Sequence, residues 1–170
     1  MTSDNREKIL IAHHIVGLSK NTMLGGSLSL MIRDVIKERK ASDIDIITND
    51  HDEFLRCIQK RASRGPYKIK SRNDIIYDCG PNILRRSYEV ASRDTQVSHR
   101  VCLFFNPYAT IEKERIPGLK SKINVCTLAD VVDAKRYIIA RVNKHVDDVS
   151  QIGLYLAKDQ QPETSIVELM

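Results

Sequence analysis

The chain has 170 residues, of which 42% are apolar and 29% are charged, and its formal net charge is +5. This composition predicts one folded domain with a single core, and it excludes a disordered chain or a collagenous repeat. The longest apolar runs are far shorter than the ~20 residues of a membrane-spanning helix, and the N-terminus lacks the apolar segment of a signal peptide. We therefore expect a cytoplasmic protein with no membrane partner, and the positive charge favours an anionic one.

Apolar spacing and turn residues predict an alternation of helices and strands. In chain order, the predicted elements are a helix over residues 4–19, a strand over 22–25, a helix over 27–40, a strand over 43–48, a helix over 50–63, strands over 67–71, 75–77, 83–90 and 101–105, a polar loop over 106–122, a strand over 123–126 and helices over 127–142 and 144–158. This order indicates an α/β (α+β) fold with a small mixed β-sheet flanked by helices.

The predicted elements form one compact unit of three parts. Residues 1–126 make up the core, residues 127–158 form a C-terminal helical pair packed on it, and residues 159–170 form a frayed tail.

One pair of motifs in the first part carries chemistry. Gly25, Gly26 and Ser27 end a strand and begin a helix with Ser27 as N-cap, which brings backbone N–H groups close to a bound phosphate. One helix later, Asp43 and Asp45 project from the same face of a strand. Paired carboxylates beside phosphate are hard oxygen ligands that suit Mg²⁺ or Mn²⁺. The alternative interpretation is a turn followed by a polar sheet face that binds no metal.

The two motifs, Leu24–Ser27 and Ser42–Ile46, resemble the signature of the nucleotidyltransferase-fold (polymerase-beta-like) superfamily. The resemblance implies that fold and a metal-dependent transfer of a nucleoside monophosphate from an NTP to a hydroxyl group. The two aspartates would hold Mg²⁺ or Mn²⁺, and the glycine–serine motif would hold the triphosphate of the NTP substrate.

The C-terminal segments Val125–Lys135 and Lys144–Val149 are similar to the region that follows the catalytic sheet in AbiE-type abortive-infection toxins, whose fold the minimal nucleotidyltransferases share. In the toxins a helix lysine and a later Lys/Arg–Asp cluster contact the nucleotide. The resemblance implies that Lys135, Lys144 and Asp148 do so here, with Lys135 joining the two aspartates as a catalytic residue. The alternatives are that Lys135 extends to water and that Lys144 and Asp148 form an intrahelical ion pair.

One position departs from the superfamily pattern. Nucleotidyltransferases usually carry a third carboxylate on a later strand, and the corresponding stretch here, Arg100–Phe104, has Cys102 at that place. A neutral thiol is a poor ligand for Mg²⁺. Either Asp94 or another acid replaces the missing carboxylate, or two carboxylates suffice for catalysis. The remaining possibility is a catalytically degenerate protein that binds nucleotide, nucleic acid or a partner protein.

A basic stretch with no acidic residue runs from Arg56 to Arg72. The candidate nucleic-acid contacts in it are Arg56, Lys60, Arg64, Lys68 and Lys70. The first three share one helix face, which is either solvated or follows the phosphates of RNA. The stretch favours an RNA acceptor such as a tRNA end, which fits a toxin-type protein with an antitoxin partner. No acidic or aromatic pocket indicates a cationic drug as the acceptor.

Overall fold

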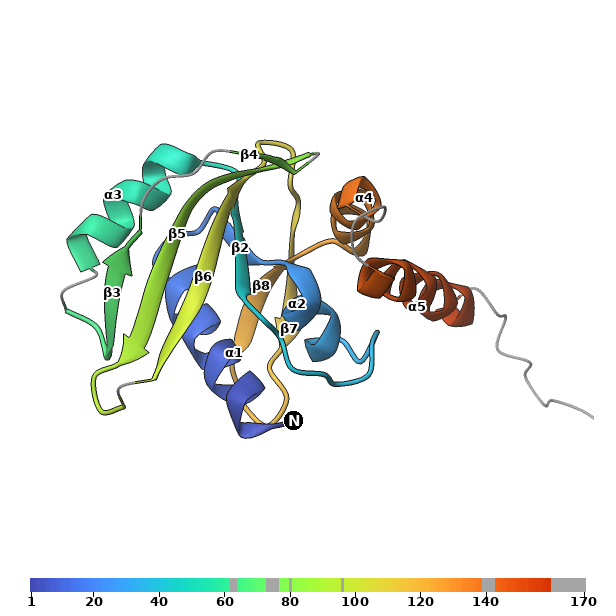
Figure 1. The fold of residues 1–170 in the computed structure, drawn as a ribbon, viewed down its shortest axis with the longest axis horizontal. Helices are drawn as coiled ribbons and strands as arrows, with labels where there is room; N and C mark the ends of the chain where they lie inside the picture. Colours follow the sequence, from blue (N-terminus) through green and yellow to red (C-terminus); the bar gives the residue numbers. More distant parts are fainter. Residues whose placement is uncertain (62–63, 73–76, 80, 96, 139–142, 160–170) are drawn as a thin grey trace, which may run out of the picture.

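The computed structural model describes residues 1–61, 64–72, 77–79, 81–95, 97–138 and 143–159. Within these residues a mixed eight-stranded sheet has the order β3-β5-β6-β2-β1-β8-β7, with β4 paired to β5 outside this path (Figure 1). The strands are β1 Thr22–Leu24, β2 Ile44–Thr48, β3 Tyr67–Ser71, β4 Tyr77–Cys79, β5 Asn82–Ser92, β6 Ser98–Phe105, β7 Ile111–Arg115 and β8 Lys122–Cys126. The helices are α1 Ser3–Val16, α2 Gly26–Ile32, α3 His51–Arg61, α4 Leu128–Ile138 and α5 Asn143–Asp159. The predicted fold class is confirmed.

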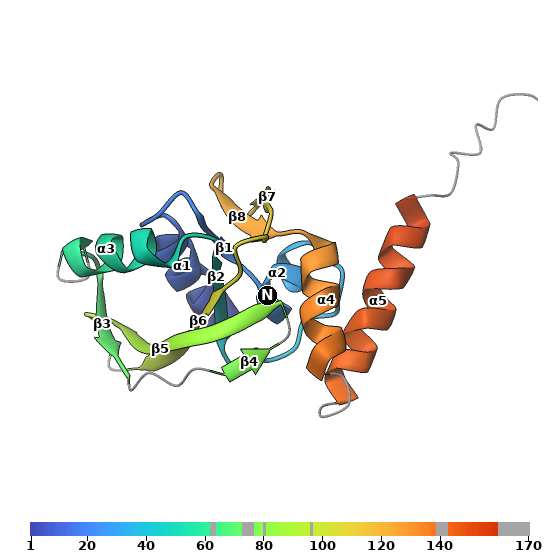
Figure 2. The same ribbon diagram turned by 90° about the horizontal axis from the view of Figure 1, so that it is seen from above.

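The core lies between the sheet and a layer that contains α1 and α3 (Figure 2). Ile44 and Ile46 on β2 and Val101 and Leu103 on β6 are buried in it, because alternate residues of a strand point to the same face. No helix among the described residues covers the opposite face over β3, β5 and β6 (Figure 2). One face of these strands is therefore open, and the other is packed.

Helix α2 is much shorter than the predicted helix over residues 27–40, which is wrong in its second half. Asp34 adopts φ 54°, and the N–H of Val35 donates to the carbonyl of Leu30 at 3.0 Å. A left-handed residue with this 6→1 hydrogen bond is the Schellman end of a helix. Val35 and Ile36 belong to the loop that follows the helix, and their side chains are buried in the core. Their spacing in the sequence continues the apolar pattern of the helix, which is why the predicted helix was too long.

The predicted loop over residues 106–122 is also wrong in part, because it contains strand β7. This strand pairs antiparallel with β8 at the edge of the sheet. Four of its five residues are charged, which hides the apolar alternation of a strand and is common on sheet edges. The buried guanidinium of Arg33 forms ion pairs with Glu112 and Glu114 and so anchors β7.

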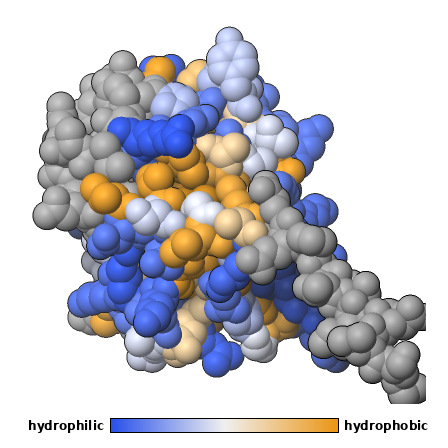
Figure 3. Space-filling model, turned by 90° about the vertical axis from the view of Figure 1, so that its right-hand side faces the viewer, coloured by the Kyte–Doolittle hydropathy of each residue, from blue (hydrophilic) through white to orange (hydrophobic). Residues whose placement is uncertain are grey.

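Helices α4 and α5 lie beyond the end of the sheet, where α4 contacts β4 (Figure 2). Figure 3 shows this side of the molecule, where hydrophobic residues gather between hydrophilic ones. On α5, Leu154 and Leu156 are exposed. None of the helices in the described ranges is long and apolar enough to cross a membrane. The predictions for residues 62–63, 75–76, 139–142 and 160–170 concern residues outside the described part of the chain.

Candidate active site

The turn between β1 and α2 lies directly against Asp45. Gly26 has φ 59°, and a Cβ atom built on it would lie 2.0 Å from Oδ2 of Asp45. The N–H of Gly25 donates to the carbonyl of Asp45 at 2.8 Å. A left-handed backbone and a contact this short both require glycine. The sequence Gly-Gly therefore brings the start of α2 into contact with the carboxylate strand.

Ser27 does not cap α2 as the sequence predicted. The helix begins at Gly26, and its N-cap Gly25 has no side chain to accept a hydrogen bond. The Oγ of Ser27 instead accepts a hydrogen bond from the guanidinium of Arg39 at 3.0 Å. The serine hydroxyl thus belongs to a cluster of polar side chains beside the turn.

Asp43 and Asp45 lie at the start of β2, and both side chains are half-buried. β2 pairs in parallel with β6, and the register places Cys102 opposite Asp45. Register partners on neighbouring strands share a face, so Cys102 lies beside the two carboxylates. Burial, with added repulsion from Asp45 and Asp43, raises the pKa of the Cys102 thiol to about 12. The thiol is therefore neutral at physiological pH.

Asp94 does not replace the missing carboxylate. It is exposed in the turn after β5, beyond the last paired residues, Ala91 and Ser98. Cys102 lies four residues along β6 from Ser98, which is about 13 Å at the usual rise of a strand. Within the described residues, no group of three His, Cys, Asp or Glu side chains could hold a metal ion. Asp43 and Asp45 therefore remain the candidate carboxylates of this site.

A buried ion cluster lies beside the turn and joins α4 and α5 to the loop before β2. The carboxylate of Asp148 is fully buried and accepts hydrogen bonds from Arg39 at 2.6 and 2.7 Å. It also forms an ion pair with the ammonium of Lys135 at 2.7 Å. Burial alone would raise the pKa of Asp148, but the hydrogen bonds from Arg39 and Lys135 outweigh it and lower that pKa. Asp148 therefore holds two cations, Arg39 and Lys135, beside the turn.

This geometry decides between the alternatives for the C-terminal residues. The side chain of Lys135 is 6% exposed and pairs with Asp148, so it does not extend to water. Asp148 pairs with residues outside α5. The side chain of Lys144 lies outside the described part of the chain.

Sequence reasoning missed Arg39, because residues 27–40 read as one helix with an exposed charged end. Its partner Asp148 is 109 residues away. The sequence feature that pointed to Arg39 was its position four residues before Asp43, close to the predicted carboxylate pair.

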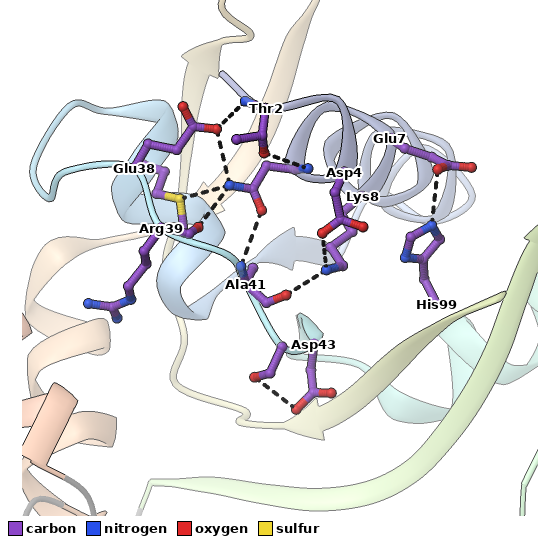
Figure 4. A network of polar contacts seen from close by, with 12 residues as sticks. Thr2, Asp4, Glu7, Lys8, Glu38, Arg39, Ala41, Asp43 and His99 are labelled. Atoms are coloured by element: carbon purple, nitrogen blue, oxygen red, sulfur yellow. Dashed lines mark hydrogen bonds and ion pairs between the residues drawn. The ribbon is translucent and has the colours of Figure 1, made fainter. Parts of the chain in front are cut away.

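The N-terminal part of α1 holds the loop that carries Arg39 and Asp43 (Figure 4). The buried amide of Asn5 donates to the carbonyl of Arg39 at 2.8 Å and accepts from the N–H of Ala41 at 3.2 Å. The ammonium of Lys8 donates to the carbonyl of Ala41 at 2.5 Å. These hydrogen bonds satisfy backbone groups of the loop that are not paired within the sheet. Helix α1 therefore fixes the position of the loop that leads into β2.

The basic stretch divides into two parts in the structure. Arg56 and Lys60 are exposed on α3, and Arg64 is exposed just after it. Lys68 and Lys70 are exposed on β3, whose intervening side chains pack against the core below α3. The helix residues and the strand residues therefore lie on different sides of the sheet.

No sequence family model matches the chain, and neither does any curated protein. Solved structures do match. The solution structure of the antibiotic-resistance factor ANT(2'')-Ia has a TM-score of 0.57 and 13% identity, over 92% of this chain and 87% of that one. The crystal structure of ANT(2'')-Ia in complex with adenylyl-2''-tobramycin has a TM-score of 0.56 and 13% identity, over 91% of both chains.

An antigenic nucleotidyltransferase-like protein from Paracoccidioides brasiliensis matches with a TM-score of 0.52 and 12% identity, over 89% of this chain and 77% of that one. The chain has the nucleotidyltransferase fold. At these identities the likeness establishes the fold alone, and it agrees with the fold that the Gly-Ser and Asp-x-Asp motifs predicted.

Proposed function

We propose that the protein transfers a nucleoside monophosphate from an NTP to a hydroxyl group of RNA. The observation that carries the proposal is the convergence of opposite charges on one turn. Asp45 lies against Gly26, and the next residue, Ser27, accepts a hydrogen bond from Arg39. Carboxylates for a metal ion and cations for phosphate thus lie on two sides of the same short segment.

The residues present fit Mg²⁺ or Mn²⁺, which would be held by Asp43 and Asp45. Because Gly26 has no Cβ atom, the Asp45 carboxylate packs directly against the turn that begins α2, where a triphosphate would bind. Mg²⁺ commonly binds through one or two carboxylates together with substrate phosphates and water, so a cage of three protein ligands is not required. When bound, the ion would neutralise phosphate charge in the transfer.

The side chains of the ion cluster would bind the triphosphate. Arg39 supplies a charged donor next to the Ser27 hydroxyl, and Lys135 supplies a second one beside Asp148. Asp148 is fully buried and would act as a positioning residue, because it holds both cations without reaching the nucleotide. Lys144 remains a proposed further contact.

The acceptor and the partners follow from charge and from the toxin resemblance. A net positive chain suits an RNA acceptor, such as a tRNA end, in the cytoplasm. A toxin of this type would be held by an antitoxin protein, for which the exposed Leu154 and Leu156 on α5 offer an apolar surface.

The second candidate is a protein that binds nucleotide without catalysis. Cys102 favours it, because a neutral thiol beside Asp45 can neither bind Mg²⁺ well nor take a proton from a hydroxyl group. Such a protein would bind an NTP with Mg²⁺ and release no pyrophosphate.

The test is incubation of the protein with each α-labelled NTP, Mg²⁺ or Mn²⁺ and total RNA. Labelled RNA from the wild type but not from Asp45→Asn supports the proposal. Equal labelling by the two proteins contradicts it. NTP binding without any product supports the non-catalytic candidate. Tobramycin serves as an alternative acceptor, since a structural neighbour holds adenylyl-2''-tobramycin.

A further inference from the structure

The sheet face that carries Asp45 continues across neighbouring strands. Asp45 on β2 pairs with Cys102 on β6, and Cys102 pairs with Ser87 on β5. Paired residues lie side by side on one face, and residues two apart on a strand share that face. Arg100, two residues before Cys102, therefore lies on the same face as the carboxylates.

The same register extends positive charge to the edge strand β3. Arg100 pairs with Glu89, and Glu89 pairs with Lys70. Lys68 lies two residues before Lys70 and shares its face. Glu89 forms an ion pair with Arg72, which compensates its charge. Among the described residues, no carboxylate forms an ion pair with Lys68, Lys70 or Arg100.

This face is open to solvent. Lys68, Lys70 and Arg100 are exposed, whereas Tyr88 and Val90 on the opposite face of β5 are buried. The open side of these strands is the lower side in Figure 2, away from α1 and α3. Three strand spacings separate β2 from β3, which is about 14 Å. This length accommodates a few nucleotides of an extended strand.

We propose that Lys68, Lys70 and Arg100 form a basic sheet face that binds the phosphates of a single-stranded RNA acceptor and leads its end to Asp43 and Asp45. The inference rests on the proposed function. The described large apolar side chains that are exposed lie elsewhere, so this face lacks the apolar anchors of a protein interface. Exposed cations on a polar surface are instead suited to a phosphate backbone.

The chain supplies a matched control from the same basic stretch. A variant with Lys68→Gln, Lys70→Gln and Arg100→Gln is compared with one carrying Arg56→Gln, Lys60→Gln and Arg64→Gln. Both variants lose three positive charges, and all six side chains are exposed. The control residues lie on α3 and just after it, on the other side of the sheet. The comparison therefore separates the effect of net charge on RNA binding from the effect of the position of the charges.

Binding of a fluorescein-labelled single-stranded RNA is measured by anisotropy without NTP, over a range of salt concentrations. Three phosphate contacts give a slope of log affinity against log salt of about −2. We expect the sheet-face variant to lose this contribution and to bind at least about tenfold more weakly at low salt, with the control close to wild type. Equal losses in both variants, or wild-type binding by the sheet-face variant, overturn the inference.

Two further measurements keep the outcomes distinct. The double variant Lys68→Gln, Lys70→Gln changes only exposed side chains of β3, so it tests the inference if the triple variant does not fold. Polyglutamate that competes as well as RNA would also overturn the proposal. RNA binding is measured without transfer, so a failure of the labelling assay with intact binding counts against the proposed function and not against this surface.

Discussion

At the residue scale, two positions control the geometry beside Asp45. Gly26 must have no side chain, because its backbone is left-handed and Asp45 occupies the space of a Cβ atom. Cys102 holds the neighbouring position on β6 and decides how many carboxylates face the site. Each of these positions has a substitution that isolates its effect.

Gly26→Ala combines a strained backbone with a clash against Oδ2 of Asp45. The strain alone costs about 1–2 kcal/mol, and we expect loss of Mg²⁺-dependent NTP binding in addition. Gly118→Ala is the control, because Gly118 has φ 77° but nothing within 4 Å of the added Cβ. The measurements are thermal unfolding and calorimetric titration with NTP. Unchanged NTP affinity in Gly26→Ala would contradict the assigned role of the turn.

Cys102→Asp places a third carboxylate beside Asp43 and Asp45. Without metal, repulsion among the three should lower the melting temperature below that of the control, Cys102→Ser. Mn²⁺ or Mg²⁺ should restore it, because an ion that binds only the folded state stabilises it. The check is thermal unfolding with EDTA and with Mn²⁺. A melting temperature that Mn²⁺ does not raise would show that Cys102 does not face a metal site.

At the element scale, α1 acts as a clamp on the loop between α2 and β2. The Asn5 amide bonds to the backbone on both sides of Lys40 (Figure 4). The loop in turn carries Arg39 toward Ser27 and Asp43 toward the start of β2. Site geometry therefore depends on a helix that contributes no side chain to the site.

Asn5→Ala leaves a buried carbonyl and a buried N–H of the loop without partners. We expect a loss of about 2–4 kcal/mol in the free energy of unfolding, together with weaker NTP binding. Thr2→Ala is the control, because it weakens the cap of α1 by about 1 kcal/mol without touching Arg39 or Ala41. Urea unfolding and NTP titration of both variants provide the comparison. Equal NTP affinity of the two variants would contradict the clamp.

The sequence predicted the elements whose signals are local. The Gly-Gly turn and the alternating Asp-x-Asp strand are each read within a few residues, and one helix separates them. The end of α2 was missed, because the buried residues Val35 and Ile36 continue the apolar spacing of the helix although they lie in the loop after it. Strand β7 was missed, because it is stabilised by β8 and Arg33 and not by apolar residues of its own.

At the scale of the whole molecule, Asp148 connects the C-terminal helices to the carboxylate end of the sheet. Its two cations come from α4 and from the loop before β2. The pairing of residues 109 positions apart depends on where α5 packs, and no local pattern in the sequence specifies that. The toxin resemblance placed Lys135 and Asp148 in the predicted site, whereas Arg39 fell within a predicted helix and was missed.

Asp148→Asn removes the charge that balances Lys135 and Arg39, which should cost about 3 kcal/mol in the free energy of unfolding. The pKa of Asp148 in the folded protein is below its ordinary value of 3.8. Its carboxylate therefore adds stability that is complete above pH 3.8 and is lost as the pH falls through the folded-state pKa.

Chemical denaturation as a function of pH checks this expectation. The wild type should lose stability below pH 3.8 more steeply than Asp148→Asn, which lacks the titrating group. Asp147→Asn makes the same chemical change at an exposed neighbour on α5 and should behave as wild type. Parallel pH curves for the wild type and Asp148→Asn would show that the ion pairs contribute nothing to folding.

The lysines of β3 have a consequence for solubility. β3 is an outer strand of the sheet, so one row of its backbone groups is available to a strand of another molecule. Lys68 and Lys70 place like charges on every copy of this edge, and charged edges oppose association between molecules. If these lysines also hold RNA, bound phosphate cancels that repulsion. We then expect the concentrated complex to self-associate more readily than the free protein, and the same two side chains to keep the free protein dispersed.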